Sequence, residues 1–239
     1  LIAADDSLDN RLLAFRIALN RQDWQKAQND LERLKQQHGN ELKVCMAEAE
    51  YLARKNQTDL AASILDEAIV RFPEASEPVI LRAAIYSDRE DALNALKLLQ
   101  DAVSRMKDQD LRKVQLWMAD LYRKMGQTRD LIELFTKLAA QNPHDILARR
   151  QLLALSRDTA DPQQLQKWIE EIKQIEGGQA GRLWKIEQAL LWMTQSDFAA
   201  KYPQTVSLLN ENLKANPDDK QSLMVLASAH EMGGNKQLA

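Results

Sequence analysis

Apolar residues recur along the chain at the spacing of helices that bury one face. Residues 111–145 show the pattern most clearly, as two successive stripes: Leu116, Ala119, Tyr122, then Leu131, Leu134, Phe135 and Leu138. This i, i+3, i+4, i+7 spacing predicts a pair of amphipathic helices. Gly126 is expected to end the first helix, because glycine readily adopts the left-handed backbone of a helix C-terminus. Thr128 is expected to cap the second helix, and Asn142-Pro143 to end it.

The same pattern returns about every 34 residues. The apolar positions of the second helices give the register: Ala27, Ala61 and Ala95; Leu31, Leu65 and Leu99; Leu34, Ala68 and Ala102; then, after a two-residue slip, Leu131, Phe135 and Leu138, followed by Leu165, Ile169 and Ile172. Helices this short are marginal alone in water, so neighbouring copies must cover one another. We therefore expect an array with repeats at residues 7–39, 40–74, 75–110, 111–145, 146–179 and 180–217, and a partial repeat at 218–239.

The apolar stripe combined with Tyr122, Gly126, Phe135 and Pro143 resembles the tetratricopeptide repeat. The resemblance implies an all-α fold: a right-handed α–α superhelix, a solenoid of antiparallel helix pairs with about six and a half repeats. It also implies one continuous domain over residues 1–239, whose first helices line a concave face that binds peptides.

Three positions depart from the family pattern. Gln115 stands where the family often has tryptophan, and Leu131 and Leu138 stand where it prefers alanine.

Individual repeats carry further signals. Glu48 occupies a position that is usually apolar, which predicts weaker packing. Ser76 is expected to cap a helix, and Asp161-Pro162 predicts a strong helix start with proline at the first position. The sixth repeat is about four residues too long near 194–202, which suggests a flexible point near residue 198, and it has Asn212 at a usually small apolar position.

Composition agrees with a folded all-α protein, with 45% hydrophobic and 28% charged residues and few glycines or prolines. The formal net charge of −3 provides no general attraction to nucleic acid or acidic lipid, so we expect neither nucleic-acid binding nor membrane insertion. The chain begins with Leu1, and the partial seventh repeat would leave an apolar face open; both suggest a segment of a longer protein that is cytoplasmic or periplasmic. Self-association through that C-terminal face is a further expectation.

Carrying over the groove-facing positions of the family gives three zones. The first is mixed: Arg16, Lys43, Met46, Glu50, Arg54, Glu77 and Ile80. The second is mainly basic: Lys113, Leu116, Asp120, Arg123, Lys124, Arg150 and Arg157. The third is apolar and aromatic: Trp184, Gln188, Leu191, Trp192, Met224 and Met232.

The basic and aromatic zones are the predicted partner-binding residues, since arginine and tryptophan dominate binding hot spots. Each zone has a plainer alternative. The charges would form a solvated helix face, and Trp184 and Trp192 would belong to the core, with Phe198 and Tyr202 available to cover them.

No pattern predicts catalysis, a cofactor or a metal. His38, His144 and His230 are far apart in the sequence, and Cys45 lies within a predicted helix, where a small buried apolar role is expected. The sequence therefore predicts a non-enzymatic scaffold that binds a protein or peptide partner. The alternatives are a non-catalytic arm of a larger enzyme or of a secretion or envelope assembly, and single-stranded RNA binding, for which the groove positions are too heterogeneous and the charge too negative.

Overall fold

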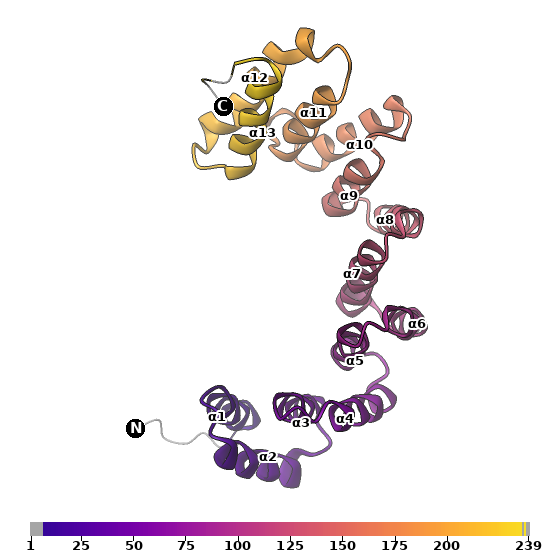
Figure 1. Cartoon of the computed structure of the whole chain (residues 1–239), viewed down its shortest axis with the longest axis vertical. Coiled ribbons are helices and arrows are strands. Elements are labelled where there is room, and N and C mark those ends of the chain that lie inside the picture. The colour runs from indigo at the N-terminus through magenta and orange to yellow at the C-terminus, as the bar shows by residue number, and fades with distance from the viewer. Residues whose placement is uncertain (1–6, 236, 238–239) are drawn as a thin grey trace. The chain divides into compact units, whose positions relative to one another are not determined.

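The computed structural model describes residues 7–235 and 237, and within these residues every regular element is a helix (Figure 1). The helices in chain order are α1 (Leu8–Asn20), α2 (Trp24–His38), α3 (Leu42–Arg54), α4 (Thr58–Arg71), α5 (Ser76–Asp88), α6 (Ala92–Val103), α7 (Asp108–Lys124), α8 (Thr128–Gln141), α9 (Ile146–Ser156), α10 (Pro162–Ile175), the short 3-10 turn η1 (Gly178–Ala180), α11 (Leu183–Met193), α12 (Phe198–Ala215) and α13 (Lys220–Met232). The predicted all-α fold class is confirmed. Nowhere in this range is a helix both long and apolar enough to cross a lipid bilayer.

The helices fall into two compact units, which we call unit 1 (Leu1–Gly126) and unit 2 (Gln127–Ala239). The division lies in the turn between α7 and α8, inside the predicted fourth repeat. That a single continuous domain spans the chain, with a flexible point near residue 198, stays a prediction.

Successive helices within each unit pack as antiparallel pairs, and the predicted second-helix positions form the core. Ala27, Ala61 and Ala95 are fully buried, as are the leucines four residues later in α4 and α6. The corresponding residues of α8 and α10 are buried too. The positions that give the 34-residue register are therefore buried in the structure. Small or branched residues at these positions let one helix approach its neighbour closely.

The turn inside each of the first four helix pairs uses one residue with positive φ. Gln22, Asn56, Glu90 and Gly126 have φ values of 58°, 58°, 60° and 69°. Gly126 thus ends α7 as expected. In the first three repeats a residue with a side chain adopts this left-handed conformation, at a cost in backbone energy that glycine avoids.

Helix starts follow the sequence signals only in part. Asp161 caps α10, its carboxylate accepting from the backbone N–H of Gln163 at 3.0 Å, and Pro162 occupies the first helical position. Asn142 is extended and ends α8, as its following proline predicts. The capping roles predicted for Thr128 and Ser76 are wrong, because each is the first residue inside its helix.

Ser76 has a different partner from the one expected. Its hydroxyl donates to the carboxylate of Asp110, at the start of α7. This hydrogen bond, with smaller contributions from Lys113, lowers the pKa of Asp110, although partial burial opposes the shift. The helix α7 begins at Asp108, three residues before the predicted boundary of the fourth repeat.

The extra residues of the sixth repeat lengthen a helix instead of a loop. The helix α12 has 18 residues, whereas α4, α8 and α10 have 14 each. The insertion supplies the first turn of α12, from Phe198, and Pro203 is accommodated inside the helix. The predicted second helix of the seventh repeat falls on residues 235–239, most of which lie outside the described residues.

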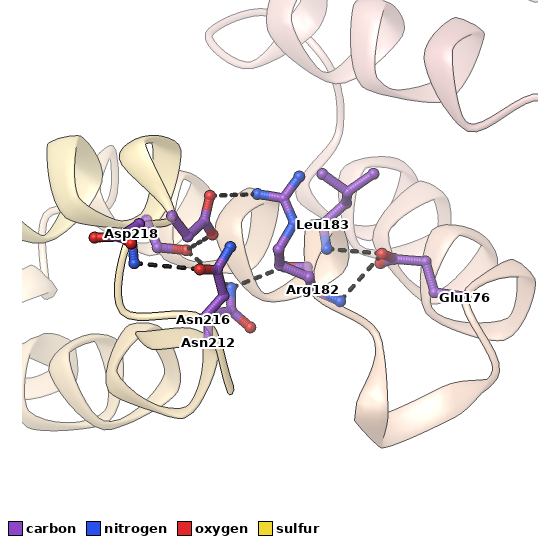
Figure 2. Close-up of polar contacts among 8 residues, drawn as sticks. Glu176, Arg182, Leu183, Asn212, Asn216 and Asp218 are labelled. Carbon is purple, nitrogen blue, oxygen red and sulfur yellow. Dashed lines mark hydrogen bonds and ion pairs between the residues drawn. The ribbon is translucent and has the colours of Figure 1, made fainter. Parts of the chain in front are cut away.

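Polar side chains connect α11 with its neighbours at the C-terminal end of unit 2 (Figure 2). The carboxylate of Glu176 accepts from the backbone N–H groups of Arg182, Leu183 and Trp184 at 3.1, 2.9 and 2.8 Å, which satisfies the free N–H groups at the start of α11. The amide of Asn212 donates to the carbonyl oxygen of Arg182 at 3.1 Å. The polar residue at this buried position of α12 thus replaces apolar packing with hydrogen bonds.

Candidate functional site

A mainly apolar cleft lies in unit 1, on the first-helix side of repeats one to three. It has a volume of about 640 Å³. Its lining comes from α1, α3, α4 and α5: Arg16, Met46, Ala49, Glu50, Ala53, Arg54, Ala61, Leu65, Leu81, Ala84, Ile85 and Asp88. Only four of these twelve side chains are charged, so an apolar body fits the interior and charged groups remain at its edges.

Alanines on the first helices leave the space open. Ala49 and Ala53 on α3 and Ala84 on α5 contribute only a methyl group each to the lining. Met46, Leu81 and Ile85 provide the larger apolar contacts around them. An interior of short side chains beside flexible methionine and branched aliphatic ones suits an inserted apolar side chain.

Of the four charged side chains in the cleft lining, two have polar partners among the described residues and two do not. Arg54 contacts Glu50 at 3.4 Å on its own helix and donates to the side-chain oxygen of Asn20 at 3.3 Å. Arg16 on α1 and Asp88 on α5 make no side-chain hydrogen bond or ion pair to the part of the chain that the structure describes. The cleft therefore has one uncompensated cation and one uncompensated anion, contributed by different helices.

Equivalent positions of neighbouring first helices are joined by polar contacts throughout the molecule. In unit 1, Lys43 contacts Asp9 at 2.7 Å, a separation of 34 residues. In unit 2, Arg182 contacts Asp219 at 2.7 Å, a separation of 37 residues. These contacts fix the register between repeats.

The predicted basic zone is divided between the two units. Lys113, Arg123 and Lys124 belong to unit 1, whereas Arg150 and Arg157 belong to unit 2. Within unit 1, Lys113 contacts Asp110 at 3.2 Å and Glu77 at 3.3 Å, and these carboxylates raise the pKa of its ammonium group.

Arg123 has a local partner as well. It contacts Asp120 at 2.8 Å, one turn earlier on α7. Lys124 is exposed. The charges of α7 are thus largely compensated, as the solvated-face alternative expects.

Arg150 and Arg157 converge on one buried carboxylate of α11. Arg150 contacts Glu187 at 2.6 Å and Arg157 contacts the other oxygen at 3.5 Å, and the side chain of Glu187 is only 4% exposed. Both arginines hold α9 and α11 together, and the single carboxylate offsets one of their two positive charges.

The aromatic zone is mostly interior. Trp184 is 8% exposed and packs in a core cluster with Leu153, Leu165 and Leu191, and Lys173 lies over its ring at 4.8 Å. Gln188 is buried and accepts from Gln166 at 2.8 Å. Trp184, Gln188 and Leu191 are therefore buried side chains of unit 2, and their role in binding a partner stays a prediction.

Trp192 is half-buried, and Met224 and Met232 are exposed. The ring of Tyr202, which the sequence offers as a cover for the tryptophans, packs edge-on against Phe198 and His230, and its hydroxyl lies 2.8 Å from Nδ1 of His230. A binding role for Trp192 and Met224 stays a prediction.

The mixed zone predicted from the sequence contains part of the cleft lining, but this zone was not selected from the sequence as a partner-binding site. Arg16, Met46, Glu50 and Arg54 appear both in the predicted mixed zone and in the lining. The eight lining residues that were missed are Ala49 and Ala53 on α3, Ala61 and Leu65 on α4, and Leu81, Ala84, Ile85 and Asp88 on α5. One signal for the cleft is present in the sequence. Ala49, Ala53 and Ala84 are small residues on the first helices, and their short side chains leave a cavity.

Metal-binding geometry is not found in the described part of the chain, where no three histidine, cysteine, aspartate or glutamate residues are grouped to hold an ion. Cys45 is buried, and its sulfur lies 3.6 Å from a guanidinium nitrogen of Arg71.

Comparison with known proteins identifies the repeat. A tetratricopeptide-repeat family model matches residues 113–145, which are the residues that carry the resemblance in the sequence. No curated protein matches the chain.

Three solved structures share the fold. The structure of PilF from Pseudomonas aeruginosa has a TM-score of 0.52 and 13% identity, over 94% of this chain and 98% of that one. PilW, titled a widely conserved type IV pilus biogenesis factor, has a TM-score of 0.51 and 14% identity, over 93% of this chain and 100% of that one. A chain of the APC/C hetero-tetramer Cut9–Hcn1 has a TM-score of 0.51 and 15% identity, over 97% of this chain and 44% of that one.

At these identities the likeness concerns the fold alone. Together with the family match it confirms the predicted resemblance to the tetratricopeptide repeat and the predicted array of antiparallel helix pairs.

Proposed function

We propose that this tetratricopeptide-repeat chain is a protein-interaction scaffold and that the cleft of unit 1 binds a segment of a partner protein. The observation that supports the proposal most is the combination of an apolar interior with an unpaired cation and an unpaired anion at its edges. A preformed cleft between helices lowers the ordering cost for the receptor, so most of the interaction energy is available for binding.

The location in unit 1 rests on a contrast in available surface. In unit 2 Trp184 and Leu191 of α11 are buried, and Arg150 and Arg157 already contact Glu187. In unit 1 the corresponding side of α3 and α5 offers alanine, methionine and branched aliphatic side chains around an open volume.

A peptide library displayed on phage tests the proposal, with the complete chain as bait. We expect peptides that are selected by the wild type to lose binding, by more than tenfold in Kd, when the cleft is filled by Ala84→Trp or when Leu81→Arg places a charge inside it. The matched control is Ala154→Trp, which enlarges an exposed alanine of α9 in unit 2. Circular dichroism checks that all three variants keep their helix content.

Selected peptides that bind the two cleft variants as tightly as the wild type, with folding intact, would contradict the assignment to this cleft. Variants of Trp184 or Arg150 are unsuitable for this purpose. Both residues stabilise unit 2, so a loss of binding would report a loss of packing.

A second candidate is a non-catalytic arm of an envelope or secretion assembly. It is favoured only by the fold shared with PilF and PilW, whose structures align over more than nine-tenths of both chains. Native gel electrophoresis of extracts from the source cells distinguishes the two functions. A permanent arm migrates with a large complex at all protein concentrations, whereas a scaffold with a transient partner dissociates on dilution.

A further inference from the structure

The cleft of unit 1 is electrically asymmetric, and this asymmetry restricts which segments fit. Arg16 lies on α1 and Asp88 on α5, so the unpaired positive charge and the unpaired negative charge are on opposite sides of α3. The other two charges, Glu50 and Arg54, compensate each other on α3 itself.

We infer that the partner segment is a short peptide in which an aliphatic residue is flanked by an acidic residue on one side and a basic residue on the other. The acidic residue faces Arg16, the aliphatic side chain enters among Met46, Leu81 and Ile85, and the basic residue faces Asp88. This inference rests on the proposed function and adds the chemistry of the ligand and its direction across the cleft.

The apolar part of the ligand follows from the interior. Eight of the twelve lining side chains are those of alanine, leucine, isoleucine or methionine, and the remaining charged pair, Glu50 and Arg54, lies on α3. An aliphatic side chain removes apolar surface from water there, at about 25 cal/mol per Å². A polar side chain would lose its hydration without gaining a hydrogen bond.

The charged flanks follow from the unpaired groups. Both Arg16 and Asp88 are exposed and retain their hydration in the free protein, so pairing them with a ligand requires little desolvation. Complementary charges at the edge of a site fix the direction of the ligand and reject the reversed charge order.

Charge exchange in the receptor tests the inference. The same phage library is selected on the wild type, on an Arg16→Glu/Asp88→Arg double variant and on the filled-cleft variant Ala84→Trp. Neither exchanged residue has a side-chain partner in the described chain, so we expect the double variant to fold. The matched control exchanges the paired residues Lys43→Glu and Asp9→Lys outside the cleft.

The expected result has two parts. Peptides selected on the wild type contain an acidic, an aliphatic and a basic residue in constant order, and each binds the double variant at least fivefold more weakly. Peptides selected on the double variant have the opposite charge order, whereas the control leaves the order unchanged.

Two outcomes would overturn the inference, and they differ in meaning. If peptides are selected and Ala84→Trp abolishes their binding, but their charges are random or do not reverse, the cleft binds segments of another chemistry and the proposed function remains. If no peptide distinguishes the wild type from Ala84→Trp, the cleft is not a binding site and the proposed function fails with the inference.

Discussion

The two units of this molecule are built from the same kind of helix pair, but the side chains on their first helices differ. In unit 1, α3 and α5 present alanines to a cleft of about 640 Å³ whose edges have unpaired charges. In unit 2, α11 buries a tryptophan, a lysine, a glutamate and a glutamine, and each of the two charged groups has a partner: Lys185 contacts Glu211 at 2.9 Å and Glu187 contacts two arginines. The same kind of helix pair therefore presents small apolar side chains to a cleft on α3 and α5 and large or charged buried side chains on α11.

The comparison also shows how the structure separates stability from recognition. A buried ion pair costs much desolvation and is strongly destabilising when one partner is removed, whereas an exposed pair contributes little. Substitutions in α11 should thus affect unfolding, and substitutions around the cleft should affect binding.

The largest effect is expected from Trp184→Ala. Removing this buried ring from the core cluster of α10 and α11 should lower the free energy of unfolding by about 3–5 kcal/mol. Urea unfolding followed by circular dichroism measures the change. Met224→Ala, an exposed apolar residue of the same unit, should change it by less than about 0.5 kcal/mol. Equal effects of the two variants would mean that Trp184 is not part of the core.

Glu187→Ala should have the next largest effect. It leaves Arg150 and Arg157 without their shared carboxylate, at a cost of about 2–3 kcal/mol because the glutamate is buried and the arginines are only partly so. The corresponding change in unit 1, Glu50→Ala, removes an exposed pair and should cost less than about 1 kcal/mol. If Glu50→Ala were the more damaging of the two, the division between a closed and an open unit would be wrong.

Acid should affect unit 2 through Asp219. Burial opposes ionisation of this carboxyl group, but hydrogen bonds from Ser222 and Arg182 outweigh it and lower its pKa below the usual 3.8. A lowered pKa stabilises the folded state above about pH 4, and this contribution is lost as the pH falls through the folded-state value.

Asp219→Asn should therefore cost about 1 kcal/mol at pH 7 and flatten the dependence of unfolding free energy on pH below 4. Urea titrations between pH 2 and pH 7 provide the comparison. An unchanged slope in the variant would mean that Asp219 does not contribute to the acid sensitivity.

The smallest effect is expected in the turns. Gly126→Ala places a side chain at a φ of 69° and should cost about 0.5–1 kcal/mol. Glu90→Gly places a glycine at a φ of 60° in another turn of unit 1, which removes the backbone strain of the side chain. It should lower stability by less than that amount or increase it. Thermal unfolding of both variants shows whether each substitution raises or lowers stability. A stabilising Gly126→Ala would show that this turn does not require the left-handed backbone.

Sequence reasoning recovered the repeat and its register because both depend on local patterns. The alanines and leucines of the second helices, the glycine at 126 and the proline at 143 each act within one helix pair. Capping was less predictable. The hydroxyl of Ser76 donates to Asp110, 34 residues away in the sequence, instead of capping its own helix. A local sequence pattern does not reveal such a distant partner.

The candidate site was recovered only in part, for a related reason. Assigning groove positions by family resemblance places residues on a face but does not show which neighbours neutralise or bury them. Arg150 and Arg157 belong to one basic zone in the sequence analysis, whereas in the structure both contact the buried carboxylate of Glu187, which lies 37 residues after Arg150. Conversely, small residues such as Ala84 attract no attention in a sequence, although they create the open volume.

Methionine-methyl NMR tests most directly whether the cleft of unit 1 is the binding surface. The chain has seven methionines, of which Met46 lines the cleft and Met224 and Met232 are exposed on α13. On titration with the most strongly selected peptide, the methyl signal of Met46 should shift while those of Met224 and Met232 stay in place. Shifts at Met224 and Met232 with an unchanged Met46 would place binding in unit 2 and contradict the assignment.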